Sequence, residues 1–127
     1  MTEWIFDIFE ENYLKILKSK KEVEGRVPDP TKERKQYDRI KKGDSILIRV
    51  VDKKFQPIDS IKPLGFIASY NKRYNSVKEM LESEGLERVL PEVNSIEEGI
   101  KLYHNLPGYE ERIKENGIYA IGLESKI

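Results

Sequence analysis

The chain has 127 residues with 23 basic and 23 acidic side chains, and therefore no net charge. Hydrophobic residues make up 38% and charged residues 36%, which is typical of a single globular domain with a heavily charged surface. The absence of cysteine excludes disulfides and thiolate chemistry, and there is neither an apolar run of about 18 residues nor the basic-then-apolar start of a signal peptide. We therefore expect one cytoplasmic domain over residues 1–127, with no membrane span.

The single histidine, His104, argues against a metal centre. Zinc and non-haem iron sites usually draw on several imidazoles or on thiolates, and this chain can supply neither set. A lone histidine that follows Tyr103 on a helix is more often a packed or surface residue than a catalytic acid. The sequence predicts no metal and no cofactor.

The N-terminal segment fits two patterns. Apolar residues from Trp4 to Leu17 recur at helical spacing, which fits one helix over residues 2–18. Residues 4–9 are also dense in aromatic and β-branched side chains, as in a buried strand followed by a helix from Glu11 to Lys18. Periodicity alone leaves both readings open.

The middle of the chain alternates between strand and turn signals. We expect a strand over residues 21–27, and then Pro28 and Pro30, where Asp29-Pro30 could cap a short helix over residues 31–37. Lys42-Gly43-Asp44 reads as a turn into a strand over residues 45–51, whose buried face is formed by Ile46, Ile48 and Val50.

The C-terminal half carries clearer boundary signals. A hairpin tip at residues 52–54 leads into an extended region over residues 58–70, in which Pro63 marks an edge or a bulge. Capping boxes at Ser76 and Ser95 open two short helices, the first ending at Gly85 and the second near Asn105. Residues 117–123 are apolar on both faces and predict a central closing strand. The expected fold is α+β: four or five strands curled into a small barrel, with short helices inserted.

The most site-like segment is the strand that carries Lys21, Glu24 and Arg26. Alternation puts Glu24 and Arg26 on one face of the strand and Val23, Gly25 and Val27 on the other, so Lys21 joins the charged pair only if the strand begins irregularly after it. Residues 18–42 hold ten basic against five acidic side chains, whereas residues 79–98 hold seven glutamates and one arginine. The basic region could attract phosphate or could be a solvated loop surface.

Three segments in this order resemble a known family. They are Lys-Ser-Lys-Lys-Glu-Val-Glu-Gly-Arg over residues 18–26, Ile-Lys-Lys-Gly-Asp over residues 40–44, and the stretch from Tyr74 to Pro91 with residues 95–99 and Tyr103 after it. Together they are similar to the activating signal cointegrator homology (ASCH) domain of the PUA-like superfamily, in its small stand-alone prokaryotic form. The resemblance implies a β-barrel-like fold with a cleft beside the Lys-x-x-Glu-x-Arg strand, and an N-terminal strand over residues 4–9. The chain departs from the family pattern at Ser19, where glycine is usual, and in a longer loop over residues 28–37.

RNA or a nucleotide-like ligand is the partner that these side chains suit best. Lys20, Lys21 and Arg26 suit phosphate or a base edge, and Glu24 can orient Arg26 or accept a base amino group. At the end of the long extended region, Tyr70, Arg73 and Tyr74 add stacking and cationic contacts for an unpaired base. The competing reading is a structural Glu24–Arg26 ion pair with core tyrosines.

An enzymatic reading uses the same cleft. Some members of the resembled family hydrolyse N4-acetylcytidine with a lysine base, a threonine nucleophile three residues later and a distant acid; here Lys21 matches the lysine, but Glu24 replaces the threonine. Glu24 could instead activate water, with Lys21 stabilising the oxyanion, and a ribonuclease is a related alternative. The distant acid has four candidates, Glu82, Glu84, Glu87 and Glu92. A protein-interaction role for the acidic residues 79–98 ranks last, because these glutamates fit the exposed faces of capped helices.

Overall fold

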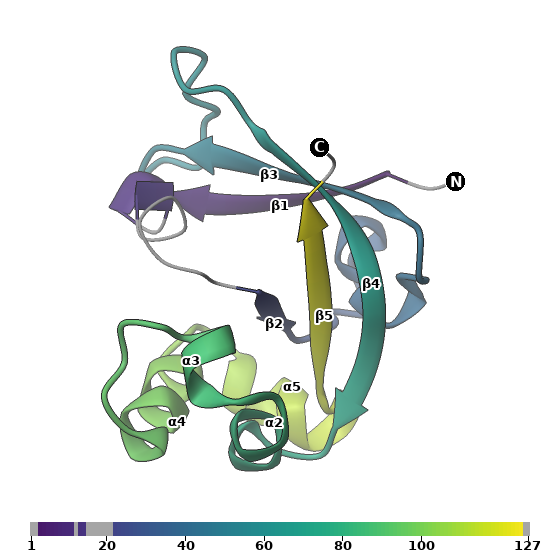
Figure 1. Ribbon diagram of the computed structural model, residues 1–127, viewed down its shortest axis with the longest axis vertical. Coiled ribbons are helices and arrows are strands. Elements are labelled where there is room, and N and C mark those ends of the chain that lie inside the picture. The colour runs from purple at the N-terminus through teal and green to yellow at the C-terminus, as the bar shows by residue number, and fades with distance from the viewer. Residues whose placement is uncertain (1–2, 12, 15–21, 126–127) are drawn as a thin grey trace.

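The computed structural model describes residues 3–11, 13–14 and 22–125 and shows an α+β fold (Figure 1). One curled five-stranded sheet forms a half-barrel with the strand order β1-β3-β4-β5-β2. Its strands are β1 (Glu3–Phe9), β2 (Val23–Arg26), β3 (Ser45–Val51), β4 (Leu64–Tyr74) and β5 (Ile118–Ser125). Four short helices gather at the end of the molecule where β2, β4 and β5 lie: α2 (Val77–Glu84), α3 (Leu86–Val89), α4 (Ile96–His104) and α5 (Tyr109–Asn116).

The N-terminal segment begins as a strand. β1 pairs in parallel with β3, from Glu3 opposite Ser45 to Phe9 opposite Val51, whereas all other pairs in the sheet are antiparallel. Phe6 is fully buried on the inner face of β1, so burial selects the strand over a single long helix. Of the helix predicted over residues 11–18, Glu11, Tyr13 and Leu14 have helical backbone, and residues 15–18 lie outside the described residues.

Two hydrophobic cores lie on opposite faces of the sheet. The inner core fills the half-barrel, and it includes the predicted inward face of β3. The outer core lies between the helices and the other face of β2, β4 and β5. Its buried members are Val23, Val27, Tyr74, Val77, Met80, Leu81, Val89, Tyr103, Ile113, Ile118 and Ala120.

β4 is the long strand that joins both cores, and it extends beyond the predicted region. Residues 58–63 form a loop, the strand begins directly after Pro63, and it continues to Tyr74. Its pairing with β5 shifts by one residue between Ala68 and Tyr70. A bulge of this kind exchanges the faces onto which the following side chains point.

The helices begin and end largely where the sequence predicts. The Ser76 and Ser95 side chains accept hydrogen bonds from the backbone N–H groups of Glu79 and Glu98, as capping boxes require. Gly85, with φ of 96°, ends α2. α3 and α5 were not expected from the sequence. No helix in the described part of the chain has the length and apolarity to cross a bilayer.

The segment between β2 and β3 covers the open side of the half-barrel. The helix expected over residues 31–37 is instead two 3-10 turns, η1 (Glu33–Lys35) and η2 (Tyr37–Arg39). Tyr37, 5% exposed, packs edge-on against Phe6 with ring centres 5.4 Å apart. The Asn71 side chain on β4 donates hydrogen bonds to two carbonyls of this segment, so η2 is fixed against the inside of the sheet.

Candidate functional site

β2 separates charged from uncharged side chains, as the alternation predicts. Val23 and Val27 are buried in the outer core, while Glu24 and Arg26 face the inside of the half-barrel opposite Ile121 and Tyr119 of β5. Gly25 lies between them where the Tyr103 hydroxyl of α4 approaches the strand: a Cβ at this position would lie 2.5 Å from that oxygen. The close approach explains the need for glycine here.

The Arg26 side chain reaches from β2, one edge strand of the sheet, to β1, the other edge strand. Its guanidinium carbon is 4.6 Å from the ring centre of Phe6 on β1 and 5.7 Å from that of Tyr37 on η2. The side chain is only 15% exposed. Burial by itself lowers the pKa of Arg26, but nearby Glu24, Tyr109 and Tyr37 outweigh it and raise the pKa above the usual arginine value. A permanent cation therefore lies beside two aromatic rings that also pack against each other.

The Glu24–Arg26 pair is looser than most arginine–carboxylate pairs of the described residues. Its closest nitrogen–oxygen distance is 3.8 Å, whereas Arg49 meets Asp7 through two hydrogen bonds of 2.8 and 3.1 Å. At 3.8 Å the pair is a charge contact and not a hydrogen bond. The Tyr37 side chain is hydrogen-bonded to the guanidinium, and Tyr109 also lies near it. A guanidinium has five N–H donors in a planar fork, and Glu24 does not hold this one in a bidentate hydrogen bond.

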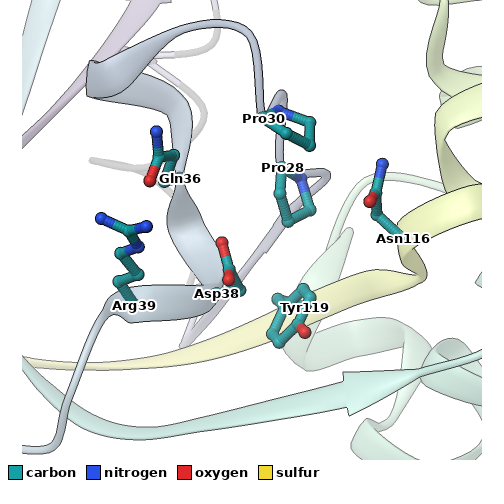
Figure 2. Close-up of a pocket in the computed structure, with 7 residues that line it drawn as sticks. All are labelled: Pro28, Pro30, Gln36, Asp38, Arg39, Asn116 and Tyr119. Carbon is teal, nitrogen blue, oxygen red and sulfur yellow. The ribbon is translucent and has the colours of Figure 1, made fainter.

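A small pocket is lined in part by Tyr119, the residue of β5 that pairs with Arg26 (Figure 2). Its volume is about 210 Å³, below the roughly 300 Å³ at which drug-sized ligand sites begin. Tyr119 forms part of the pocket wall, and Figure 2 shows Pro28, Asp38 and Asn116 as other parts of this wall. The complete lining is Pro28, Pro30, Gln36, Asp38, Arg39, Asn116 and Tyr119. A wider adjoining hollow shares Gln36, Asp38 and Arg39 and also includes Trp4 of β1.

The predicted stacking residues do not gather around Arg26. After the bulge in β4, Tyr70 and Tyr74 face the helices, and both hydroxyls donate hydrogen bonds to the Glu84 carboxylate of α2. Burial, followed by the hydrogen bond to Glu84, raises the pKa of Tyr74 to about 12. The two tyrosines therefore belong to a hydrogen-bonded group that links α2 to the sheet on the opposite face from Arg26.

Arg73 lies on the same face of the sheet as Arg26. It pairs across the sheet with Tyr119, whose other neighbour is Arg26. Its Nε donates to the carbonyl of Asn116 at 3.2 Å, so Arg73 supports the rim of the pocket through Asn116.

The remaining predicted residues are distributed as follows. Lys20 and Lys21 lie outside the described residues. Of the four candidate acids, Glu84 is buried, while Glu82, Glu87 and Glu92 are exposed. Among the described residues, no three histidine or carboxylate side chains come close enough together to hold a metal ion.

Sequence reasoning missed the aromatic surroundings of Arg26. Phe6, Tyr37 and Tyr119 come from three separate segments, and only the sheet register and the folding back of η2 bring them together. The one local signal was an aromatic residue, Tyr37, within the Pro-bounded basic loop.

Two solved structures resemble the chain along nearly all of its length, although no protein-family model and no curated protein sequence matches it. A crystal structure of the hypothetical protein PH0355 is 36% identical, with a TM-score of 0.73, and the match covers 97% of this chain and 98% of that one. The solution NMR structure of Protein PF0455 from Pyrococcus furiosus is 38% identical, with a TM-score of 0.67, and the match covers 97% of this chain and 96% of that one.

Proposed function

This chain belongs to one protein family with PH0355 and PF0455, and we propose that it binds single-stranded RNA or a nucleotide-like ligand at the inner face of β2. We further propose that the family is an ASCH-type branch of the PUA-like superfamily, acting in the cytoplasm. The curled half-barrel with short helices and the Lys-x-x-Glu-x-Arg motif of β2 support that placement.

The carrying observation is the guanidinium of Arg26. It lies beside the Phe6 and Tyr37 rings, but its closest carboxylate oxygen is 3.8 Å away. Arg26 is thus held by two aromatic contacts and a loose charge contact, and not by a bidentate carboxylate pair. A planar, charged fork that no carboxylate holds in a bidentate pair suits a base edge or a phosphate, both of which accept two parallel hydrogen bonds.

The adjoining pocket supports the same ligand class. Tyr119, Pro28 and Pro30 offer flat apolar surface, and Gln36, Asp38 and Asn116 offer donors and acceptors of the kinds that read base edges. Its volume of about 210 Å³ suits one small planar group better than a large ligand. No observation favours the hydrolase reading, whose lysine, Lys21, lies outside the described residues.

Fluorescence anisotropy with a labelled single-stranded RNA of about ten nucleotides would test the proposal. Arg26→Lys keeps the charge but loses the fork and the planar stacking, so affinity should fall about tenfold, the equivalent of one lost bidentate contact. Affinity should also fall steeply with added salt.

Arg49→Lys is the matched control. Arg49 is also an arginine paired with a carboxylate on the sheet, but it lies on the outer face of β3, so its replacement should leave RNA affinity unchanged. If RNA and nucleotides fail to bind the native protein, or if both variants bind like the native protein, the proposal is wrong.

A further inference from the structure

A closed turn after β2 brings several cations together beside Arg26. The backbone N–H of Asp29 donates to the carbonyl of Lys35 at 2.9 Å, and the N–H of Lys32 donates to the carbonyl of Asp29 at 3.0 Å. These bonds fold residues 29–35 back on themselves, so Lys32 and Lys35 belong to one compact turn. Both side chains are exposed.

α5 adds a further cation to this turn. Nη1 of Arg112 donates to the Asp29 carboxylate at 3.0 Å, and its guanidinium lies 5.1 Å from the ring centre of Tyr109. The other carboxylate oxygen of Asp29 accepts hydrogen bonds from the backbone and side chain of Thr31 at 3.1 and 2.6 Å. The single buried acid of the turn is therefore engaged in fixing α5 to it.

The cations are not fully compensated. The pKa of Lys35 is lowered, first by partial desolvation of its largely exposed side chain and then by repulsion from Lys32 and Arg112. Arg26 adds a smaller repulsion, and Asp29 acts in the opposite direction. In addition, Nε of Arg112 is buried and has no hydrogen-bond acceptor among the described residues. Two lysines in one closed turn, near an arginine that has a donor without an acceptor, are characteristic of a site that binds an anion.

We propose that Lys32, Lys35 and Arg112, here called the basic cluster, bind a phosphate group of the ligand whose base contacts Arg26. A phosphate carries up to two negative charges and three acceptor oxygens, and so can meet two ammonium groups and a guanidinium at once. The basic cluster is close to the pocket. Pro30 of the pocket belongs to the turn of residues 29–35, and Pro28 and Gln36 lie directly before and after it. This inference deepens the proposed function and rests on it for the nucleotide nature of the ligand.

Isothermal titration with inorganic pyrophosphate at constant ionic strength tests the basic cluster without a base. We expect saturable binding to the native protein and at least a fivefold loss of affinity, on the order of one weakened charged contact, in Lys35→Gln. Lys114→Gln is the matched control, because Lys114 is exposed on α5 beyond the cluster and its loss should leave binding unchanged. Equal affinities in the two variants, or no saturable binding to the native protein, would refute the inference.

A second titration separates this inference from the proposed function. The native protein should bind cytidine 5′-monophosphate about tenfold more tightly than cytidine, and Lys35→Gln should remove that difference. If both ligands bind equally well to the native protein, the base site stands and the phosphate site is wrong. If pyrophosphate binds through Lys35 while nucleotides and RNA bind no better than pyrophosphate, the phosphate site stands and the proposed function is wrong.

Discussion

Replacing Arg26 by methionine should lower the free energy of unfolding by about 3 kcal/mol. The substitution keeps most of the aliphatic packing on Phe6, but it removes a cation–π contact at 4.6 Å, worth about 1 kcal/mol at a largely desolvated site. It also removes the charge beside Glu24. The Arg26 and Glu24 side chains are only 15% and 11% exposed, so solvent screens little of their interaction. Its loss adds about 2 kcal/mol to the destabilisation.

A double-mutant cycle isolates the interaction between the two charges. Glu24→Gln alone should cost about 2 kcal/mol, and the double variant with Arg26→Met should cost about 3 kcal/mol instead of the additive 5, a coupling of about 2 kcal/mol. Urea denaturation followed by far-ultraviolet circular dichroism gives all four free energies.

The same cycle on Asp7 and Arg49 is the control. This pair has shorter hydrogen bonds but is 40% and 32% exposed, so its coupling should not exceed about 1 kcal/mol. The reasoning is refuted if the Glu24–Arg26 coupling is below about 0.5 kcal/mol or no larger than that of the exposed pair.

Two further perturbations test the packing on the opposite face of the sheet. Gly25→Ala should destabilise the protein by about 2 kcal/mol, because the new Cβ would lie 2.5 Å from the Tyr103 hydroxyl oxygen; a thermal melt identical to that of the native protein would contradict this. The raised pKa of Tyr74 means that its contribution to stability is complete below about pH 10 and is lost as pH rises toward 12. In Tyr74→Phe the free energy of unfolding should therefore fall less steeply at alkaline pH. The variant should also lack one high-pH step in the tyrosinate absorbance titration. An unchanged titration would argue against the hydrogen bond to Glu84.

The sequence predicted those elements whose signals are local. The strand over residues 45–51 has the predicted bounds, because its inward residues alternate regularly and each is at most 1% exposed. The helix beginning after Ser76 was predictable because its cap and its ending glycine lie within ten residues of each other. The position of Glu24 and Arg26 on one face follows from the same kind of local rule.

The features that could not be predicted depend on distant parts of the chain. Regular alternation predicts one set of faces from Leu64 through Tyr70. The β4–β5 register shifts after Ala68, so Tyr70 and Tyr74 face the helices and Arg73 faces the inside of the half-barrel. α5 was missed because Tyr109–Asn116 is mostly charged and has only one buried apolar residue, Ile113. Nothing local indicates that Arg112 of this helix meets Asp29, 83 positions earlier.

β2 and β5 pair with each other although they are far apart in the sequence, and this determines when the proposed site can form during synthesis. β2 is held to the sheet by β5, with Arg26 opposite Tyr119, so the inner face of β2 has no strand partner until the last strand leaves the ribosome. Pairings this distant in sequence slow folding, because loop closure costs entropy before any contact repays it. A nascent chain that lacks β5 would therefore carry Arg26 on a strand with no paired neighbour. Any binding through the proposed site would require β5 to have folded against β2 first.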